Sequence, residues 1–207
     1  RTEPGVSSEA LVRAAQQVCT GGDLRAEVLV IGSGPGGALT ACLLAEAGRD
    51  VLLLEEGACL PLDSCAPFSL EELAQKYRNG GQTVALGRNK IAYVEGCCVG
   101  GGSEINSGLY HRTPPEILER WQREFHVEAA SESDLRPHFE AIERELSVSR
   151  APGALPAAAL KLREGAARLG WRSVEVPRWM RFDSDAAGGT AAGRRQSMTA
   201  TFLPRFV

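Results

Sequence analysis

The sequence has no excess of positive charge. Its 23 lysines and arginines are scattered among 26 aspartates and glutamates, which gives a formal net charge of −3. A surface that binds nucleic acid carries clustered lysine and arginine side chains, and no such cluster is present in the sequence. We therefore expect no nucleic-acid partner.

Long apolar runs are also absent. A helix that crosses a membrane needs roughly 18 or more consecutive apolar residues, and a secretory signal needs a shorter apolar core near the N-terminus. The sequence contains neither pattern. We expect a cytoplasmic protein without a membrane span.

Metal-binding and disulfide patterns are missing as well. The six cysteines form no C-x-x-C pair and show no ligand spacing with the three histidines. This argues against zinc and against a disulfide framework, and it favours reduced thiols. We predict no metal site.

A starting methionine and a polar tail are also lacking. The chain begins at Arg1 and stops at the segment SMTATFLPRFV. These two ends lead us to expect a piece of a longer protein.

A glycine-rich turn is the first strong pattern that is present. Residues 28–31, VLVI, predict a strand buried on both faces of a parallel sheet, and the alanine-rich residues 38–47 predict a helix. Between them, Gly32, Gly34 and Gly37 occupy the three positions of a G-x-G-x-x-G fingerprint. These glycines permit a tight turn, the approach of a pyrophosphate and close packing of helix on strand. The pattern predicts a dinucleotide phosphate site at the start of the helix.

A second strand completes the unit. Residues 51–54, VLLL, end at Glu55, which follows Gly32 at about the 20-residue spacing of an acid that binds a ribose. We interpret the adjacent Glu56 as a solvated neighbour. This β-α-β unit leaves both NAD and FAD open as ligands.

A second group of glycines follows residues 91–94, an expected short strand. Gly100, Gly101 and Gly102 precede Ser103, Glu104, Ile105 and Asn106. Glycine loses the most backbone entropy on ordering, so three in a row favour a place where the backbone lies against a flat or charged ligand. The amide of Asn106 offers both a donor and an acceptor to a ring edge. A flexible surface loop remains the alternative.

The sequence resembles the glucose-methanol-choline (GMC) oxidoreductases. The resemblance rests on VLVIGSGPGGA, VLLLEEG and GCCVGGGSEINSG, and it continues through DLRPHFEAIERELSV and GRRQSMTATFLP. The segments YRNGG and LYHRTP are most similar to the branch that acts on long-chain or lipophilic alcohols.

This resemblance implies an α/β chain with a Rossmann-like FAD-binding fold, followed by a helical excursion toward an incomplete substrate domain. We expect an N-terminal helical extension at residues 1–24, the FAD-binding part at 25–112 and the substrate part at 113–207. Some members of the family carry a histidine just before the signature asparagine, joined covalently to the flavin. Ile105 occupies that position here, which implies non-covalent FAD. The implied cofactor-binding residues are Gly32, Ser33, Gly34, Pro35, Gly36, Gly37, Glu55, Val99, Gly100, Gly101, Gly102 and Asn106.

The resemblance also implies oxidation of an alcohol by hydride transfer to N5 of FAD. The family's catalytic histidine pair lies near its C-terminus and has no match here, so we assign no catalytic residue. Of the three histidines, His111 is nearest to the flavin signature. We expect a companion C-terminal half or second chain to supply the missing groups. Two alternatives remain: another FAD-dependent oxidoreductase, such as a monooxygenase or reductase, or a non-catalytic flavin-fold fragment.

The second half of the sequence predicts helices and one loop. Ile117, Trp121 and Phe125 fall on one helical face, which indicates a buried stripe. A further buried stripe is expected from Leu135, Phe139, Ile142 and Leu146. Residues 183–195 are rich in glycine and alanine and predict a loop.

Overall fold

The computed structural model describes residues 23–61, 63–182 and 193–206. They form two compact units: one holds the described residues up to 107 together with residues 196–206, and the other holds the described residues between 108 and 195. The chain thus leaves the first unit at Gly108 and returns to it at Gln196. The expected N-terminal helix lies outside the described residues, and the domain boundaries at 24 and 112 stay predictions.

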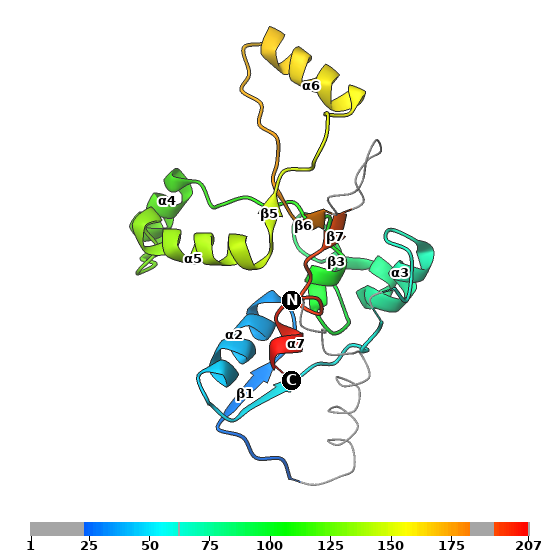
Figure 1. Ribbon diagram of the computed structural model, residues 1–207, viewed down its shortest axis with the longest axis vertical. Helices are drawn as coiled ribbons and strands as arrows, with labels where there is room; N and C mark the ends of the chain where they lie inside the picture. Colours follow the sequence, from blue (N-terminus) through cyan, green and yellow to red (C-terminus); the bar gives the residue numbers. More distant parts are fainter. Residues whose placement is uncertain (1–22, 62, 183–192, 207) are drawn as a thin grey trace. The chain divides into compact units, whose positions relative to one another are not determined.

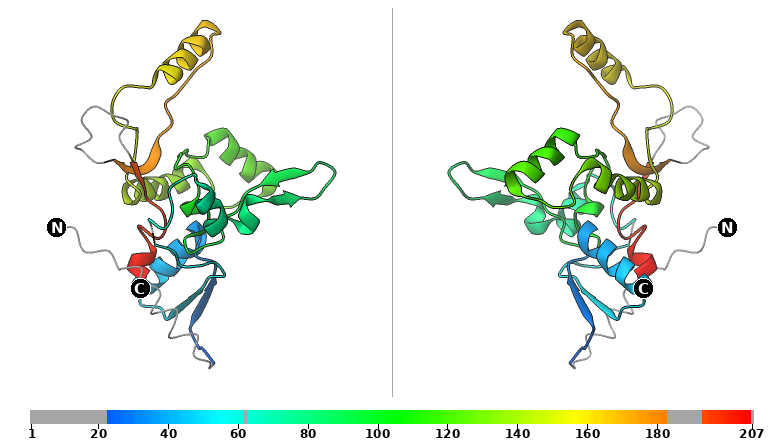
Figure 2. Two further views of the ribbon diagram at one scale, coloured as in Figure 1. Left: turned by 90° about the vertical axis from the view of Figure 1, so that its right-hand side faces the viewer. Right: turned by 90° about the vertical axis from the view of Figure 1, so that its left-hand side faces the viewer.

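The first unit contains a parallel strand pair, an antiparallel hairpin and short helices (Figure 1). Its elements are β1 (Val28–Ile31), α2 (Pro35–Glu46), β2 (Val51–Leu54), α3 (Leu70–Lys76), the 3-10 turn η1 (Arg78–Gly81), β3 (Thr83–Ala85), β4 (Ile91–Tyr93), the 3-10 turn η2 (Gly101–Glu104) and α7 (Leu203–Phe206). Figure 2 shows the β3–β4 hairpin extending as a two-stranded ribbon.

The predicted β-α-β unit is confirmed. Strands β1 and β2 pair in parallel, with Val28 opposite Val51 and Ile31 opposite Leu54. Helix α2 begins three residues earlier than expected because Pro35 occupies its first turn, a position that suits proline. A Cβ atom at Gly37 would overlap the carbonyl oxygen of Gly32, so only glycine allows the helix to start this close to the strand.

The expectation that β1 is buried on both faces is wrong. Val28 and Val30 are half-buried on the face toward α2, whereas Leu29 is 54% and Ile31 80% exposed on the opposite face. Leu54, beside Ile31 in the register, is 40% exposed. The physical reason is that, among the described residues, no layer covers this second face.

The second unit contains three helices and a small antiparallel sheet. Its elements are α4 (Pro115–Phe125), α5 (Glu132–Glu145), β5 (Val148–Ser149), α6 (Ala157–Arg168), β6 (Arg178–Phe182) and β7 (Gly193–Arg195), and the strand order is β5-β6-β7. Helix α5 starts with a full capping box between Ser131 and Asp134. Helix α6 stands away from the sheet between two segments without regular structure (Figure 1).

Three expectations for this unit need correction. In α4, Leu118 is the buried residue, while Trp121 is 40% and Phe125 62% exposed. In α5, the expected stripe is only half-buried, and Leu146, just past its end, is the buried member. Helical periodicity identifies an apolar face, but burial also needs an element that packs against it. Residues 193–195 form β7 rather than a loop because they pair with β6, and residues 183–192 lie outside the described residues.

Candidate cofactor site

The two glycine turns, at residues 32–37 and 100–106, meet in the first unit. The backbone N–H of Gly100 donates a hydrogen bond to the Oγ of Ser33 at 3.0 Å. A Cβ atom at Gly101 would lie 3.0 Å from the Cα of Gly34, so the two backbones pass in direct contact. Gly100 and Gly101 have φ angles of 91° and 54°, which favour glycine. The two motifs therefore lie side by side in the first unit.

Ser33 also joins this site to the acid that follows β2. Its Oγ donates to Oε2 of Glu55 at 2.6 Å, and its backbone N–H donates to the same oxygen at 2.8 Å. The other carboxylate oxygen accepts from the N–H of Gly57 at 2.8 Å. The backbone of Glu56 also hydrogen-bonds this carboxylate, so its hydrogen-bond partners come from three neighbouring residues. Glu55 is only partly buried, so a ribose hydroxyl can approach its carboxylate.

The charge of Glu55 is favoured at neutral pH. Partial burial acts to raise its pKa, but the hydrogen bonds from Ser33 and from the backbone together outweigh burial and hold the pKa below its usual value. The side chain is therefore an acceptor, as binding of a ribose hydroxyl requires.

The N-terminus of α2 suits an anion. No side chain caps it, and its first turn holds no acidic residue. Cβ atoms at Gly34 and Gly36 would meet no heavy atom within 4 Å, so the space beside these backbones is open. A helix N-terminus with open backbone is a common phosphate site. Pro35 sets the helical φ here without a donor of its own.

The second glycine turn, residues 100–106, borders a cavity of about 510 Å³. Gly102, Ile105 and Asn106 line it together with Arg78, Val94, Glu95 and Gly96. The side-chain amide of Asn106 donates to the carbonyl oxygen of Gly102 at 3.0 Å. Val99 lies on the other side of the loop, where its N–H donates to the carbonyl of Ala58 at 3.0 Å. The cavity volume lies in the range of small-molecule sites.

Arg78 links this cavity to the acids of the first unit. Its guanidinium pairs with Glu95 at 2.6 Å and with Glu56. Glu56 is thus an exposed ion-pair partner and lies outside the Ser33–Glu55 contact, as the sequence indicated.

All predicted cofactor residues therefore lie in the first unit, around two meeting turns. The arrangement fits a dinucleotide: an open helix N-terminus for phosphates, a carboxylate for a ribose, and a cavity beside Asn106 for a ring.

Three polar residues that support the site were missed in the sequence. Ser103 accepts from the N–H of Met198 at 3.0 Å, and Glu104 accepts from the hydroxyl of Thr199 at 2.6 Å. Ser103 is fully buried and Glu104 is 7% exposed. For Ser103 and Glu104, polarity next to three glycines was the available signal. Nothing in the sequence indicated Thr199 or Met198 as their partners.

Two vicinal cysteines, Cys97 and Cys98, precede the second glycine turn. Burial, followed by the nearby carboxylate of Glu104, raises the pKa of Cys98 to about 12. Cys97 is only partly buried, and both thiols are free. Their place beside the loop is structural: Gly57 packs directly on the backbone of Cys98.

The three histidines lie in the second unit, whereas the predicted cofactor residues lie in the first. His111, His126 and His138 are all exposed. His126 is the C-cap of α4, with a positive φ of 53°.

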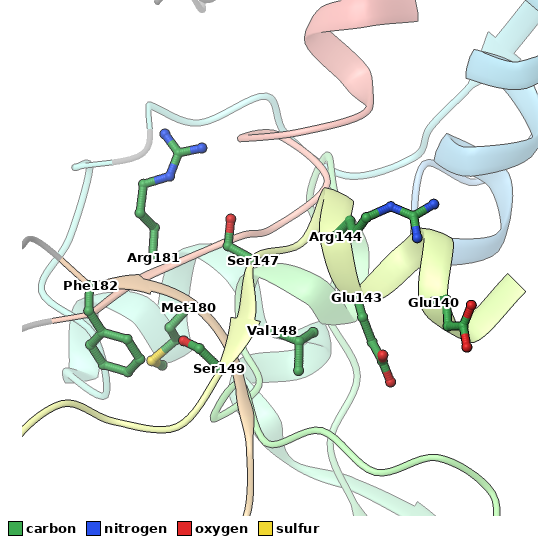
Figure 3. Close-up of a pocket in the computed structure, with 9 residues that line it drawn as sticks. All are labelled: Glu140, Glu143, Arg144, Ser147, Val148, Ser149, Met180, Arg181 and Phe182. Atoms are coloured by element: carbon green, nitrogen blue, oxygen red, sulfur yellow. The ribbon is translucent and has the colours of Figure 1, made fainter. Parts of the chain in front are cut away.

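The larger cavity, of about 640 Å³, lies in the second unit. Figure 3 shows Met180 and Phe182 on one side of β6 and Arg181 on the other, with Glu143 on the neighbouring helix α5. Glu143 forms a bidentate ion pair with Arg112 at 2.6 and 2.7 Å. Burial, with Glu143 nearby, raises the pKa of Tyr110 to about 12. None of the predicted cofactor residues lines this cavity.

In the part of the chain that the structure describes, no group of three or more metal-ligating side chains is arranged around a common point. The helices of the same part are too short or too polar to cross a membrane.

Comparison with known families matches two consecutive stretches. Residues 30–61 match the NAD(P)-binding Rossmann-like domain, and residues 73–207 match the GMC oxidoreductase family. The second match covers more than half of the chain.

Individual relatives agree with these matches. An uncharacterized GMC-type oxidoreductase from Sinorhizobium fredii is 39% identical over 188 residues, which cover 88% of this chain and 37% of the relative. A long-chain-alcohol oxidase from Arabidopsis thaliana is 28% identical over 173 residues, covering 84% of this chain and 23% of that enzyme. The chain thus spans well under half the length of these relatives.

A solved structure supports the fold. Pyridoxine 4-oxidase from Mesorbium loti superposes with a TM-score of 0.58 at 17% identity, over 86% of this chain and 39% of that one. The Rossmann-like fold, the meeting glycine turns and the sequence matches agree, and the flavin chemistry of the family implies a flavin cofactor in general. The chain belongs to the GMC oxidoreductase family.

Proposed function

We propose that the chain is the FAD-binding portion of an oxidoreductase that acts on CH–OH groups. In this proposal FAD is held without a covalent bond, and an alcohol is oxidised to a carbonyl compound. The observation that carries the proposal is the contact between the two glycine turns, in which Ser33 bonds both Gly100 and Glu55.

Each part of the site has a role toward the cofactor. FAD, when bound, supplies the N5 atom that accepts the hydride. The open first turn of α2 holds the pyrophosphate, and Glu55 accepts from the ribose of the adenosine. Gly102 and Asn106 border the cavity that receives the ring system. Ile105 is buried and has no nucleophilic atom, which supports non-covalent binding.

The substrate class is supported by relatives. The Arabidopsis thaliana relatives are named long-chain-alcohol oxidases. We infer that the substrate of the complete enzyme is an alcohol of lipophilic character.

The base that accepts the alcohol proton comes, in this proposal, from polypeptide that the relatives contain and this chain does not span. A positioned base is worth about 10² to 10⁴ in rate. The exposed histidines of the described chain do not supply it.

The face of the β1–β2 sheet that no described residue covers supports such a companion. Parallel sheets are normally covered on both faces, yet Leu29, Ile31 and Leu54 are 54%, 80% and 40% exposed. We propose that the remaining part of a GMC oxidoreductase, as a second chain or a continuation, packs on this face.

FAD binding tests the proposal. Titration of the chain with FAD, followed by flavin fluorescence, is expected to show weak binding, and stronger binding after addition of the remaining portion of the Sinorhizobium fredii relative. Acid precipitation is expected to leave the yellow colour in solution. Tight stoichiometric binding by the chain alone would contradict the need for a companion, and a yellow pellet would contradict non-covalent binding.

A matched pair of variants tests the companion surface. Ile31→Glu places a charge on the face of the β1–β2 sheet that holds Leu29 and is expected to abolish the gain in FAD binding from the added portion. Leu162→Glu places the same charge on exposed α6 and serves as the control. An undiminished gain with Ile31→Glu would show that this face is not covered.

A further inference from the structure

Residues 197–199, which follow the return of the chain to the first unit, form a turn that hydrogen-bonds the second glycine turn, residues 100–106. The N–H of Met198 donates to Ser103 Oγ at 3.0 Å, and Thr199 Oγ1 donates to Glu104 Oε1 at 2.6 Å. Each contact joins residues 95 positions apart in the sequence. Ser103 and Glu104 are buried, as are Ser197 and Met198. This turn, residues 197–199, is therefore a buried support for the loop.

A continuous series of hydrogen bonds runs from this turn to Glu55. Ser103 Oγ accepts from Met198 and donates to the carbonyl of Gly100 at 2.6 Å. The N–H of Gly100 donates to Ser33, whose hydroxyl donates to Glu55. A backbone N–H can only donate, and a carbonyl or carboxylate can only accept, so each serine hydroxyl has one orientation that satisfies both neighbours.

This series fixes Gly100 on both sides. Its carbonyl is held by Ser103 and its N–H by Ser33. The carboxylate of Glu104 occupies the space that a side chain at position 100 would take. The backbone that touches Gly34 is thus kept in its left-handed conformation by side chains that lie behind it.

We propose that Ser103, Glu104 and Thr199 are positioning residues of the cofactor site, which couple the 197–199 turn to both glycine turns. They act through Gly100 and Ser33. The effect on FAD rests on the proposed function; the effect on the two turns does not.

Four variants of the full chain test this coupling. Thr199→Val keeps the side-chain shape and removes the hydroxyl that Glu104 accepts from, and Ser103→Ala removes the link between Met198 and Gly100. Thr201→Val is the matched control: Thr201 follows the turn, and its hydroxyl donates to the carbonyl of Ser197 at 2.7 Å. Thr199→Ser retains the hydroxyl and is the rescue variant.

The first measurement needs no cofactor. Amide hydrogen exchange is followed in peptides that cover residues 32–37 and 98–106. Thr199→Val and Ser103→Ala are expected to exchange about tenfold faster than wild type in both peptides, as the loss of one hydrogen bond implies, while Thr201→Val and Thr199→Ser stay near wild type. Unchanged exchange in Thr199→Val and Ser103→Ala, or an equal rise in Thr201→Val, would overturn the proposal.

The second measurement uses FAD as the probe. The Kd of Thr199→Val and Ser103→Ala is expected to rise about tenfold, with a changed visible circular dichroism of the bound flavin, and Thr199→Ser is expected to restore both. Faster exchange without any change in Kd or dichroism would overturn the role toward the cofactor. If the wild type binds no FAD even with the companion portion, the proposed function fails, and the exchange experiment still decides the coupling.

Discussion

The glycine turns of the first unit and the helices of the second unit differ in how far their side chains are buried and held by contacts. Ser33 and Ser103 are fully buried and hydrogen-bonded on both sides. By contrast, Phe125 of α4 and Leu162 of α6 are 62% and 77% exposed. Local steric and polar constraints fix the turns, whereas much of the apolar surface of these helices is uncovered in the part of the chain described. The same type of substitution should therefore have different effects in the two regions.

Glycine-to-alanine substitution should give the largest difference in the free energy of unfolding between the two regions. Gly37→Ala places a methyl group on the carbonyl oxygen of Gly32, and we expect a loss of about 4 kcal/mol or more in the free energy of unfolding. Gly165→Ala in α6 meets open space and should stabilise by about 0.5 to 1 kcal/mol. Urea denaturation followed by far-ultraviolet circular dichroism measures both, and an equal effect would remove the contrast.

Truncation of leucines sharpens the comparison within the second unit. Leu118→Ala in α4 removes a side chain that is 1% exposed and should cost about 2 to 5 kcal/mol. Leu162→Gln on α6 changes a side chain that is 77% exposed and should stay within about 0.5 kcal/mol. All three tryptophans lie in this unit, so tryptophan fluorescence during urea denaturation reports the difference. A large loss with Leu162→Gln would show that α6 is covered in solution.

Removal of a serine hydroxyl should give a smaller difference in the free energy of unfolding between the two regions. Ser33→Ala leaves the buried N–H of Gly100 without its acceptor and removes a donor from Glu55, which should cost about 1 to 3 kcal/mol. Ser149→Ala, at an exposed position in the second unit, should have almost no effect. Urea midpoints decide this, and a neutral Ser33→Ala would mean that the two turns are not held by this hydroxyl.

The smallest expected effect is a dependence of the free energy of unfolding on pH through Glu55. The pKa of Glu55 lies below its usual 4.5 because its hydrogen bonds together outweigh the opposing effect of burial. A lowered folded-state pKa contributes stability above pH 4.5, and this contribution is lost as the pH falls through the folded-state value. Unfolding measured between about pH 3 and pH 7 should therefore show a smaller acid-induced loss in Glu55→Gln than in wild type. Identical slopes would show that Glu55 is not held by these bonds.

The sequence predicted the turns well because their constraints are local. Gly37 must be glycine beside Gly32, and Glu55 follows directly on β2, so a spacing of residues determines the geometry. The family resemblance assigned residues of both turns to one cofactor, which requires the turns to lie close together, and Gly34 and Gly101 are in contact.

The sequence did not predict contacts that depend on packing between distant segments. Thr199 lies 95 residues from Glu104, and no motif joins them. Likewise, the apolar face with Trp121 and Phe125 was taken as core, because periodicity does not show whether another element covers it. Leu118 is buried instead, one residue from the predicted stripe.

Amide hydrogen exchange during an FAD titration tests the central claim most directly. If both glycine turns contact one flavin nucleotide, peptides covering residues 32–37 and 98–106 should gain protection together, with the same dependence on FAD concentration. Saturable FAD binding that protects only one of these peptides, or neither, would contradict the account.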